Sequence, residues 1–544
     1  MTFRARRIRL AAALLAVTVV IGCGPASPAV PGDPAVVTTT AGPVRGAVMP
    51  GEASGSASGD RKGGYRLFQG IPYAAAPVGA LRWQPPVAPE PWRTVRDATK
   101  PGLRCIQDIR IDPDYGLPTS EDCLNLSVWT PAGATPESRR PVMVWIHGGG
   151  FLNGSSDLYH ARWLATRGDI VVVTVNYRLG ALGFLAHPAL ARSDASGGAP
   201  DPGNYGLADQ QQALRWVRDN IDRFGGDPER VTIAGESAGA MSVCNHLVAP
   251  ESWGLFRAAI MQSGPCQAQA ALPEAKRVSV AFAAQAGCAD PATAGACLLA
   301  LPAARLEGGP GYVTIGANNV ISGPVTGTER LPVAPPVAAG EGRRIERVPV
   351  LIGSTADEFT VFVAISYLRH KTLPPYPALL RQTFGPRAGA VAEEYPLHRY
   401  DGSTGLAYAA AVTDGVFACP IDALATDLAR RAPVFAYEFN DRNAPAPEPL
   451  RHTPFPPGAG HALELRYLFN MGGAPKLTPA QQQLSEQMID YWSAFVRTGS
   501  PDADGQPRWP ALNPEEPQRM TLQTGESVVT GDFAARHRCG FWNG

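Results

Sequence analysis

The chain has 544 residues, of which 45% are hydrophobic and 18% are charged, a composition typical of a globular protein with a large core. Its basic and acidic residues number 48 each, so there is no basic surplus of the kind that binds nucleic acid. The 58 glycines and 53 prolines indicate many loops.

The N-terminus has the pattern of an export signal. Several arginines precede the apolar run 10–21, which is too short to span a bilayer, and the next two residues are Gly22 and Cys23. This arrangement resembles a bacterial lipobox, whose cysteine carries the lipid. An ordinary cleaved signal peptide is the alternative. We expect residues 1–22 to be a lipoprotein-type signal peptide and Cys23 to be the lipidation site.

The mature chain is then expected to begin with a flexible tether, residues 23–35, which is rich in Gly, Pro, Ala and Ser. Residues 36–544 are expected to form one domain, because no internal repeat or second boundary is visible. The protein would be exported, either held at the membrane through the lipid on Cys23 or secreted. The sequence does not indicate its oligomeric state.

Several predicted elements alternate along this domain. A strand pair over 36–48 is followed by a low-complexity loop at 50–60. Short β-branched runs then predict buried strands, and amphipathic stretches between them predict helices, a pattern typical of an α/β fold with a parallel sheet covered on both faces. The strands are expected at 141–146, 170–176, 230–234, 258–261, 348–352 and 434–439, and helices at 207–224, 240–248 and 484–497.

Two long segments, 270–345 and 358–430, are predicted to be helix-rich insertions and loops. Such segments usually lie over the carboxyl ends of the strands, where α/β sheets bind ligands.

The strand at 230–234 leads into Gly-Glu-Ser-Ala-Gly, residues 235–239, and a helix follows. A serine in G-x-S-x-G between a strand and a helix is typical of a nucleophile elbow, in which tight turning exposes the hydroxyl to a cleft. In a glycine-rich chain the motif can also arise by chance. It gains weight if a base, an acid and oxyanion donors occur in the expected places.

A serine nucleophile needs a base, and the base needs an acid that orients it; in this arrangement the chain order is Ser, acid, His. Asp357 and Glu358 follow the strand at 348–352. Among the later histidines, His461 lies in a small-residue loop that suits a base, whereas His452 lies among prolines. The histidines that follow Glu358 are His370, His398, His452, His461 and His537.

The oxyanion of the reaction needs backbone N–H donors. One is expected from Ala238, directly after the serine, and others from the glycine-rich loop His147–Gly150 after the strand at 141–146. Glycine suits this loop because a side chain would fill the space of the substrate carbonyl.

With these residues in place, the chain resembles the type-B carboxylesterases, a family that includes para-nitrobenzyl-type esterases, carboxylesterases, some lipases and cholinesterases. The resemblance implies an α/β-hydrolase fold and no cofactor. The similar blocks are FQGIPYA at 68–74, SEDCLNL at 120–126, HGGGF at 147–151, NYR at 176–178, NYGLADQ at 204–210, FGGDP at 224–228, GESAG, QSG at 262–264, Asp357–Glu358 and GAGH through Glu464–Leu465.

The resemblance also assigns roles. It places the acid on Glu358, from an Asp-Glu-Gly motif whose third position is Phe359 here, with Asp357 as the fallback. It places the loop donors on Gly149 and Gly150. The expected catalytic residues are therefore Ser237, Glu358 and His461.

Eight cysteines remain after Cys23, and an even number in an exported protein favours disulfides over metal sites. No C-x-x-C or H-E-x-x-H spacing occurs, so no metal is expected. The resemblance implies the pairs Cys105–Cys123, Cys288–Cys297 and Cys419–Cys539. Cys244 and Cys266 are left, and are paired by elimination.

The predicted function is hydrolysis of small or medium-chain carboxylic esters, with a small-molecule ester as the only expected partner. A non-catalytic cell-surface binding protein on the same fold is one alternative, and the complete Ser, Glu and His set argues against it. Cholinesterase-like members of the family carry a tryptophan within the first disulfide loop, where it can bind a cation. Here residues 106–122 contain Tyr115 but no Trp, so the resemblance does not favour a cholinesterase-type cation site. A long-chain lipase is a further alternative, since its lid would lie in that same loop.

Overall fold

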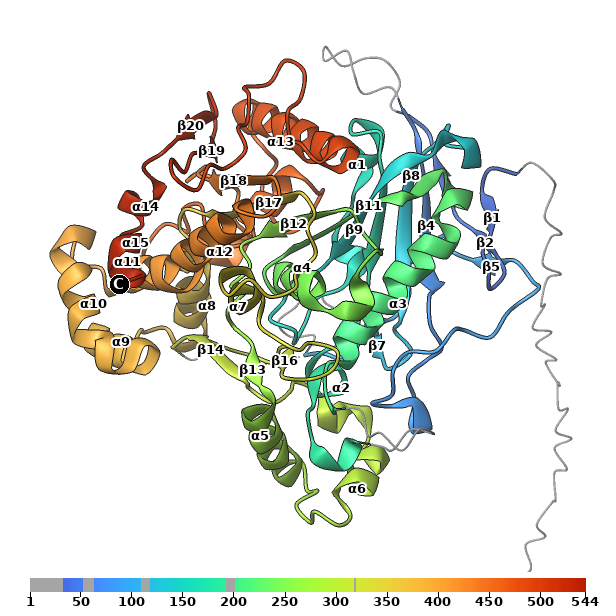
Figure 1. The fold of residues 1–544 in the computed structure, drawn as a ribbon, viewed down its shortest axis with the longest axis horizontal. Coiled ribbons are helices and arrows are strands. Elements are labelled where there is room, and N and C mark those ends of the chain that lie inside the picture. The colour runs from blue at the N-terminus through green and yellow to red at the C-terminus, as the bar shows by residue number, and fades with distance from the viewer. Residues whose placement is uncertain (1–32, 52–62, 109–117, 192–200, 318) are drawn as a thin grey trace, which may run out of the picture.

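The computed structural model describes residues 33–51, 63–108, 118–191, 201–317 and 319–544 (Figure 1). The expectations for the signal peptide, for Cys23, for most of the tether and for most of the loop at 50–60 lie outside these residues, as does Tyr115. Residues 33–35 already contact the domain: Asp33 pairs with Arg45 at 2.7 Å, and the carbonyl of Ala35 accepts a hydrogen bond from the N–H of Gly46.

The centre of the molecule is an 11-stranded sheet, which crosses the middle of Figure 1. Its central strands are parallel to their neighbours, and they contain every strand that was predicted from the β-branched runs. In sheet order they are β10 (Val171–Val175), β9 (Arg140–Ile146), β11 (Gly226–Glu236), β12 (Ala258–Gln262), β17 (Val350–Thr355), β18 (Val434–Phe439) and β19 (Arg519–Leu522).

Antiparallel strands extend both edges of this parallel core. Apart from the strand at 47–49, which overlaps the end of the pair predicted over 36–48, they were not predicted as strands, because polar residues interrupt the apolar pattern of the longer ones. They are β8 (Asn125–Pro131), β4 (Tyr65–Pro72) and β3 (Ala47–Met49) beyond β10, and β20 (Val528–Thr530) beyond β19. The predicted strand pair at the start of the domain forms β1 (Val36–Thr38) and β2 (Pro43–Arg45) of a separate small sheet.

Both faces of the parallel core are covered, because every residue of β10, β12, β17 and β18 is buried although successive side chains point to opposite faces. Helices α3 (Tyr205–Asn220) and α4 (Ala238–Val248) lie in front of the sheet in Figure 1. Helices α1 (Arg162–Thr166) and α13 (Pro479–Thr498) pack together and against the strands. The predicted α/β-hydrolase architecture is confirmed.

The two predicted insertions hold small helices and strands outside the sheet. The first contains α5 (Leu272–Gln285) and α6 (Ala294–Ala300), which project at the bottom of Figure 1, the hairpin β14 (Val313–Gly316) with β15 (Asn319–Ile321), and α7 (Pro335–Gly340). The second contains α8 (Thr360–His370), α9 (Tyr376–Phe384) and α10 (Ala388–Glu394).

The second insertion ends in a continuous helical run, made of α11 (Thr404–Val412), the π-helical segment η11 (Thr413–Ala418) and α12 (Cys419–Ala429). By length and composition this run resembles a membrane span, but most of its apolar window is buried inside the domain. It is therefore a core helix of the fold.

Four disulfides join the pairs that the sequence analysis expected. Three close short loops, whereas the fourth joins residues 120 positions apart and ties the C-terminus to α12. Such bonds are typical of proteins from an oxidising, extracytoplasmic compartment. The pairs are Cys105–Cys123, Cys244–Cys266, Cys288–Cys297 and Cys419–Cys539.

Candidate active site

Ser237 occupies the turn between the end of β11 and the start of α4. Its φ of 55° and ψ of −122° are rare for a residue with a side chain, and such a conformation costs about 1–3 kcal/mol that the surrounding fold must offset. The turn is held by hydrogen bonds from the N–H of Ser237 to the carbonyl of Gln262 and from the N–H of Met241 to the carbonyl of Ser237, both 2.9 Å.

Gly239 explains why the elbow needs its flanking glycines. A Cβ at this position would overlap the carbonyl oxygen of Ile146, at the end of neighbouring β9. Only glycine lets the helix begin this close to the sheet, and its N-terminus then points toward the serine.

His461 and Glu358 meet although they lie 103 residues apart. Nδ1 of His461 and Oε2 of Glu358 are 2.6 Å apart, and both side chains are buried. Their loops are also joined through the backbone, because the N–H of His461 donates to the carbonyl of Glu358. Oε1 of Glu358 accepts a hydrogen bond from the N–H of Thr355, so the carboxylate has a fixed orientation.

The opposite nitrogen of the ring, Nε2 of His461, lies 3.0 Å from Oε1 of Glu236, in a geometry too bent for a hydrogen bond. Within the described part of the chain, no hydrogen bond joins this nitrogen to the hydroxyl of Ser237. Both residues nevertheless line the same cavity. Catalytic hydrogen bonds are often long in the absence of substrate and tighten in its complex.

Buried carboxylates surround His461, and they control its protonation. Burial by itself would lower the pKa of His461, but the negative charges of Glu236 and Glu358 and the hydrogen bond to Glu358 raise it to about 9. Burial raises the pKa of Glu236 to about 7 and that of Glu464 to about 8, and the charge of Glu358 adds to both. Each carboxylate that takes up a proton removes part of the charge that keeps His461 protonated.

Gly149, Gly150 and Ala238 line the cavity beside Ser237, and their backbone N–H groups are the donors expected for an oxyanion. In the described part of the chain none of them donates a hydrogen bond. Ala238 is the first residue of α4, where helix geometry leaves the N–H without a partner. Gly149 has a φ of 104°, and a Cβ there would overlap Asn153. The loop is thus able to present free donors to an anion.

His147 anchors the first residue of the glycine-rich loop at 147–150 through its contacts with Tyr177. Burial lowers the pKa of His147 to about 4, so its ring is neutral, and it stacks on Tyr177 at 4.4 Å between ring centroids. The hydroxyl of Tyr177 donates to the carbonyl of His147 at 2.8 Å. This packing fixes the start of the loop.

The cavity above Ser237 has a volume of about 450 Å³ and mostly apolar walls. The rings of Phe362 and Phe417 lie 4.9 and 5.4 Å from the ring of His461. Part of the apolar wall comes from the two insertions, through Ile315, Val320, Ile321, Phe362, Ile365 and Phe417.

Asp357, the fallback acid, does not face His461. One of its oxygens pairs with Arg442 at 3.0 Å, and the other accepts a hydrogen bond from the N–H of Ala459. Phe359, which replaces the glycine of the family motif, is buried and donates its N–H to the hydroxyl of Thr413, so Glu358 still reaches His461.

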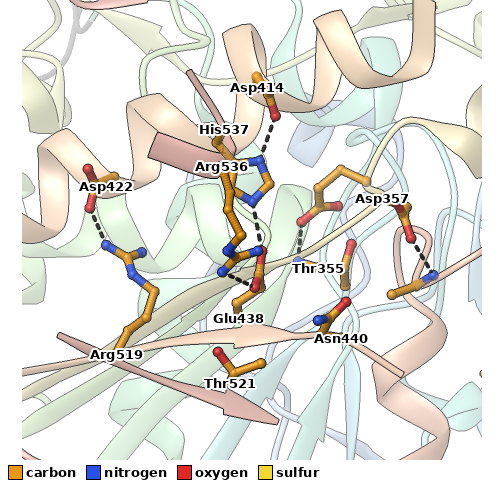
Figure 2. A network of polar contacts seen from close by, with 12 residues as sticks. Thr355, Asp357, Asp414, Asp422, Glu438, Asn440, Arg519, Thr521, Arg536 and His537 are labelled. Carbon is orange, nitrogen blue, oxygen red and sulfur yellow. Dashed lines mark hydrogen bonds and ion pairs between the residues drawn. The ribbon is translucent and has the colours of Figure 1, made fainter. Parts of the chain in front are cut away.

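Asp357 lines a second cavity of about 360 Å³, next to another buried histidine (Figure 2). His537 lies between Asp414, 2.5 Å from Nδ1, and Glu438, 2.7 Å from Nε2. Glu438 also pairs with Arg536. The other predicted candidates, His370, His398 and His452, are exposed.

Sequence reasoning had assigned no role to Glu236, Glu464 or Gln262. Glu236 lies inside the G-x-S-x-G motif, and Glu464 follows His461 by three residues, which is the only signal that could have pointed to them. Oε1 of Glu464 accepts a hydrogen bond from Nε2 of Gln262, and Oε1 of Gln262 accepts one from Trp492. No cluster of potential metal ligands occurs among the described residues.

Comparison with known proteins places this site in a family. The model of the carboxylesterase family matches residues 33–542. Acylcarnitine hydrolase of Rattus norvegicus is 36% identical, over 89% of this chain and 87% of that protein. Para-nitrobenzyl esterase of Bacillus subtilis is 34% identical, over 89% and 96%. Cocaine esterase of Homo sapiens is 34% identical, over 88% and 87%.

The family match spans nearly all of the described domain, and the relatives are similar over most of their own length. The chain therefore belongs to the carboxylesterase family and is a carboxylic-ester hydrolase of the serine-hydrolase type.

Proposed function

We propose that Ser237 is the nucleophile of this esterase, His461 its general base and Glu358 the acid that orients the base. The observation that carries the proposal is the 2.6 Å contact between Nδ1 of His461 and Glu358, at the wall of the cavity that Ser237 also lines. Glu358 keeps the proton on Nδ1, so that Nε2 is free to accept one, and it stabilises the imidazolium that then forms.

In the first step Nε2 of His461 takes the proton of Ser237 while the serine oxygen attacks the ester carbonyl. The carbonyl oxygen becomes an oxyanion, which accepts hydrogen bonds from the N–H groups of Gly149, Gly150 and Ala238. His461 returns the proton to the leaving alcohol, and an acyl-enzyme remains. Water, activated by the same histidine, then releases the acid and restores the serine.

A labelled fluorophosphonate probe tests the nucleophile. Wild type should be labelled and Ser237→Ala should not, with the folded state of the variant checked by its thermal transition. Equal labelling of the two proteins, or no labelling of either, would defeat the proposal and favour a binding protein on the same fold.

We further propose that small and medium-chain esters are the preferred substrates. The cavity of about 450 Å³ has the size of a pocket for a small molecule, and its apolar walls suit a short acyl or alcohol group. Hydrolysis rates across acyl chain lengths test this. Rates that rise toward long chains, with activation at a lipid interface, would indicate a lipase.

We also propose that the protein is a lipoprotein, with residues 1–22 as signal peptide, the lipid on Cys23 and one domain following the tether. The four disulfides support export but not the anchor. Mass spectrometry of the mature N-terminus tests it: a lipidated Cys23 is expected, and an unmodified N-terminus at another residue would refute the anchor.

A further inference from the structure

The cavity above Ser237 contains a positive charge that the proposed reaction does not use. Its lining includes only three ionisable acidic or basic side chains among the described residues: Glu236, His461 and Arg369. The first two lie against each other beside Ser237. Arg369 belongs to the last turn of α8, in the second insertion. The chemistry at the serine therefore gives no reason for a guanidinium at this place.

The register of α8 places Arg369 at the outer part of the cavity wall. Phe362, Ile365 and Arg369 are spaced i, i+3 and i+7, so they share one face of the helix, and all three line the cavity. The ring of Phe362 lies 4.9 Å from that of His461. Seven residues of helix span roughly 10 Å, so Arg369 lies about that far along α8 from Phe362, whose ring lies against His461.

Arg369 is also without an anionic partner. Its side chain is exposed, and no hydrogen bond or ion pair joins it to another residue of the described chain. The arginines of the second cavity differ, because Arg442, Arg536 and Arg538 each pair with a carboxylate. The cavity of the serine thus holds a cation whose charge is available to a ligand.

A helix C-terminus attracts cations by its dipole, and His370 and Lys371 follow Arg369 in the chain. That effect accounts for basic residues at this end of α8. It does not require one of them to lie on the cavity-facing stripe, and neither His370 nor Lys371 lines the cavity. The position of Arg369 therefore needs a separate explanation.

We propose that Arg369 gives the enzyme a preference for esters that carry a second, negatively charged group, a carboxylate, roughly 10 Å from the scissile carbonyl. The planar guanidinium binds a carboxylate through two parallel hydrogen bonds, and the apolar wall between Arg369 and His461 accommodates the chain that separates the two groups. This inference rests on the proposed function of Ser237 and adds its substrate class.

The carboxylate is either on the acyl part or on the alcohol part of the ester. Monoalkyl esters of succinate, adipate, suberate and sebacate test the acyl side, with the dialkyl esters as neutral controls. Acetyl esters of ω-hydroxy acids, with their amides as controls, test the alcohol side. The quantity to compare is the ratio of kcat/KM for each anionic ester to that for its neutral control.

This ratio should rise with chain length in wild type, and Arg369→Gln should lower it by about fivefold for the best anionic ester. Arg369→Lys should restore only part of it, since an ammonium lacks the second parallel hydrogen bond. Arg369→Glu should shift the preference toward esters with a distal cation. Added salt should weaken the preference of wild type, because the site is exposed.

Lys371→Gln is the matched control, because it removes one nearby exposed cation that does not line the cavity. A fall of the ratio that is equal in Arg369→Gln and Lys371→Gln, or no fall in Arg369→Gln, would overturn the proposal. Failure of the proposed function would look different: Ser237 would not be labelled, and neutral esters would not be hydrolysed by wild type.

Discussion

The molecule holds two buried histidines in similar surroundings, and only one of them lines the same cavity as Ser237. His461 lies between Glu358 and Glu236, and His537 lies between Asp414 and Glu438. Their exposed fractions are 7% and 5%. In both, burial opposes the charged ring and the carboxylates outweigh it, so both pKa values are raised to about 9.

The difference lies in what surrounds each pair. Around His461 are Ser237 in its strained turn and three N–H groups without partners. Around His537 is Arg536, which pairs with Glu438 (Figure 2). Arg538 pairs with Asp414, and the hydroxyl of Tyr395 donates a hydrogen bond to Asp414. A carboxylate–imidazole pair is therefore not by itself evidence of catalysis. The strained serine and the N–H groups without partners are what distinguish the surroundings of His461.

Replacing each histidine in turn tests this distinction most strongly. His461→Gln should lower kcat for a neutral ester by about 10⁴-fold or more, because the serine loses its base. His537→Gln should change kcat only a few-fold. Steady-state kinetics at a temperature where both variants are folded provides the measurement. Equal losses in the two variants would remove the distinction.

The donors can be tested at Gly149. In Gly149→Ala the new Cβ would overlap Asn153, and the residue would keep a φ of 104° that disfavours a side chain. The loop must therefore move, and its N–H groups would no longer point toward the oxyanion. We expect kcat to fall by about 10²- to 10³-fold, and the strained loop to lower the thermal stability as well. Gly133→Ala is a control, because a Cβ there meets no other atom. Unchanged kcat in Gly149→Ala would show that this loop does not bind the oxyanion.

The role of His537 should appear in stability. Its pKa is raised in the folded protein from about 6.5 to about 9, so its contribution is fully present below pH 6.5 and is lost as the pH rises through 9. His537→Gln should cost about 3 kcal/mol at neutral pH, because it removes one cationic partner from two buried carboxylates.

The melting temperature across pH 6 to 10, measured for wild type and His537→Gln, tests this assignment. The loss relative to wild type should shrink toward alkaline pH. His452→Gln, at an exposed histidine, is the control and should follow wild type. A loss that stays the same at every pH would mean that the charge of His537 does not contribute.

The smallest effect is expected at Glu236. Its carboxylate is one of the charges that raise the pKa of His461, and the base acts only when neutral. Glu236→Gln should therefore lower that pKa and move the acidic limb of kcat/KM against pH to lower pH. The shift should be visible mainly where Glu236 is ionised in wild type, above its own raised pKa of about 7.

Glu464→Gln allows a second comparison, since the charge of Glu464 raises the pKa of His461 less than the charges of Glu236 and Glu358 do. It should move the limb in the same direction by less. A limb that moves to higher pH in either variant would contradict the electrostatic account of this histidine.

Sequence reasoning predicted the parallel strands and the elbow because both depend on local pattern. β-branched runs identified the strands β9, β10, β11, β12, β17 and β18. The roles of Ser237, Glu358 and His461 were expected from their order along the chain. The contact of Glu236 with His461 and the setting of His537 arise between distant loops, and no periodicity encodes them. The edge strands β4 and β8 were missed because their pairing depends on neighbours rather than on their own apolar pattern.

The serine and part of the cavity wall belong to different elements of the fold, and this affects how the substrate range of the enzyme can change. Ser237 and its donors stand on β9, β11 and α4, where even one added methyl group at Gly239 has no room. One part of the cavity wall belongs instead to α8 and the β14–β15 hairpin, which are not part of the central sheet. New substrate ranges are therefore accessible through wall substitutions such as those at Ile315 or Ile365, with the reaction machinery left intact.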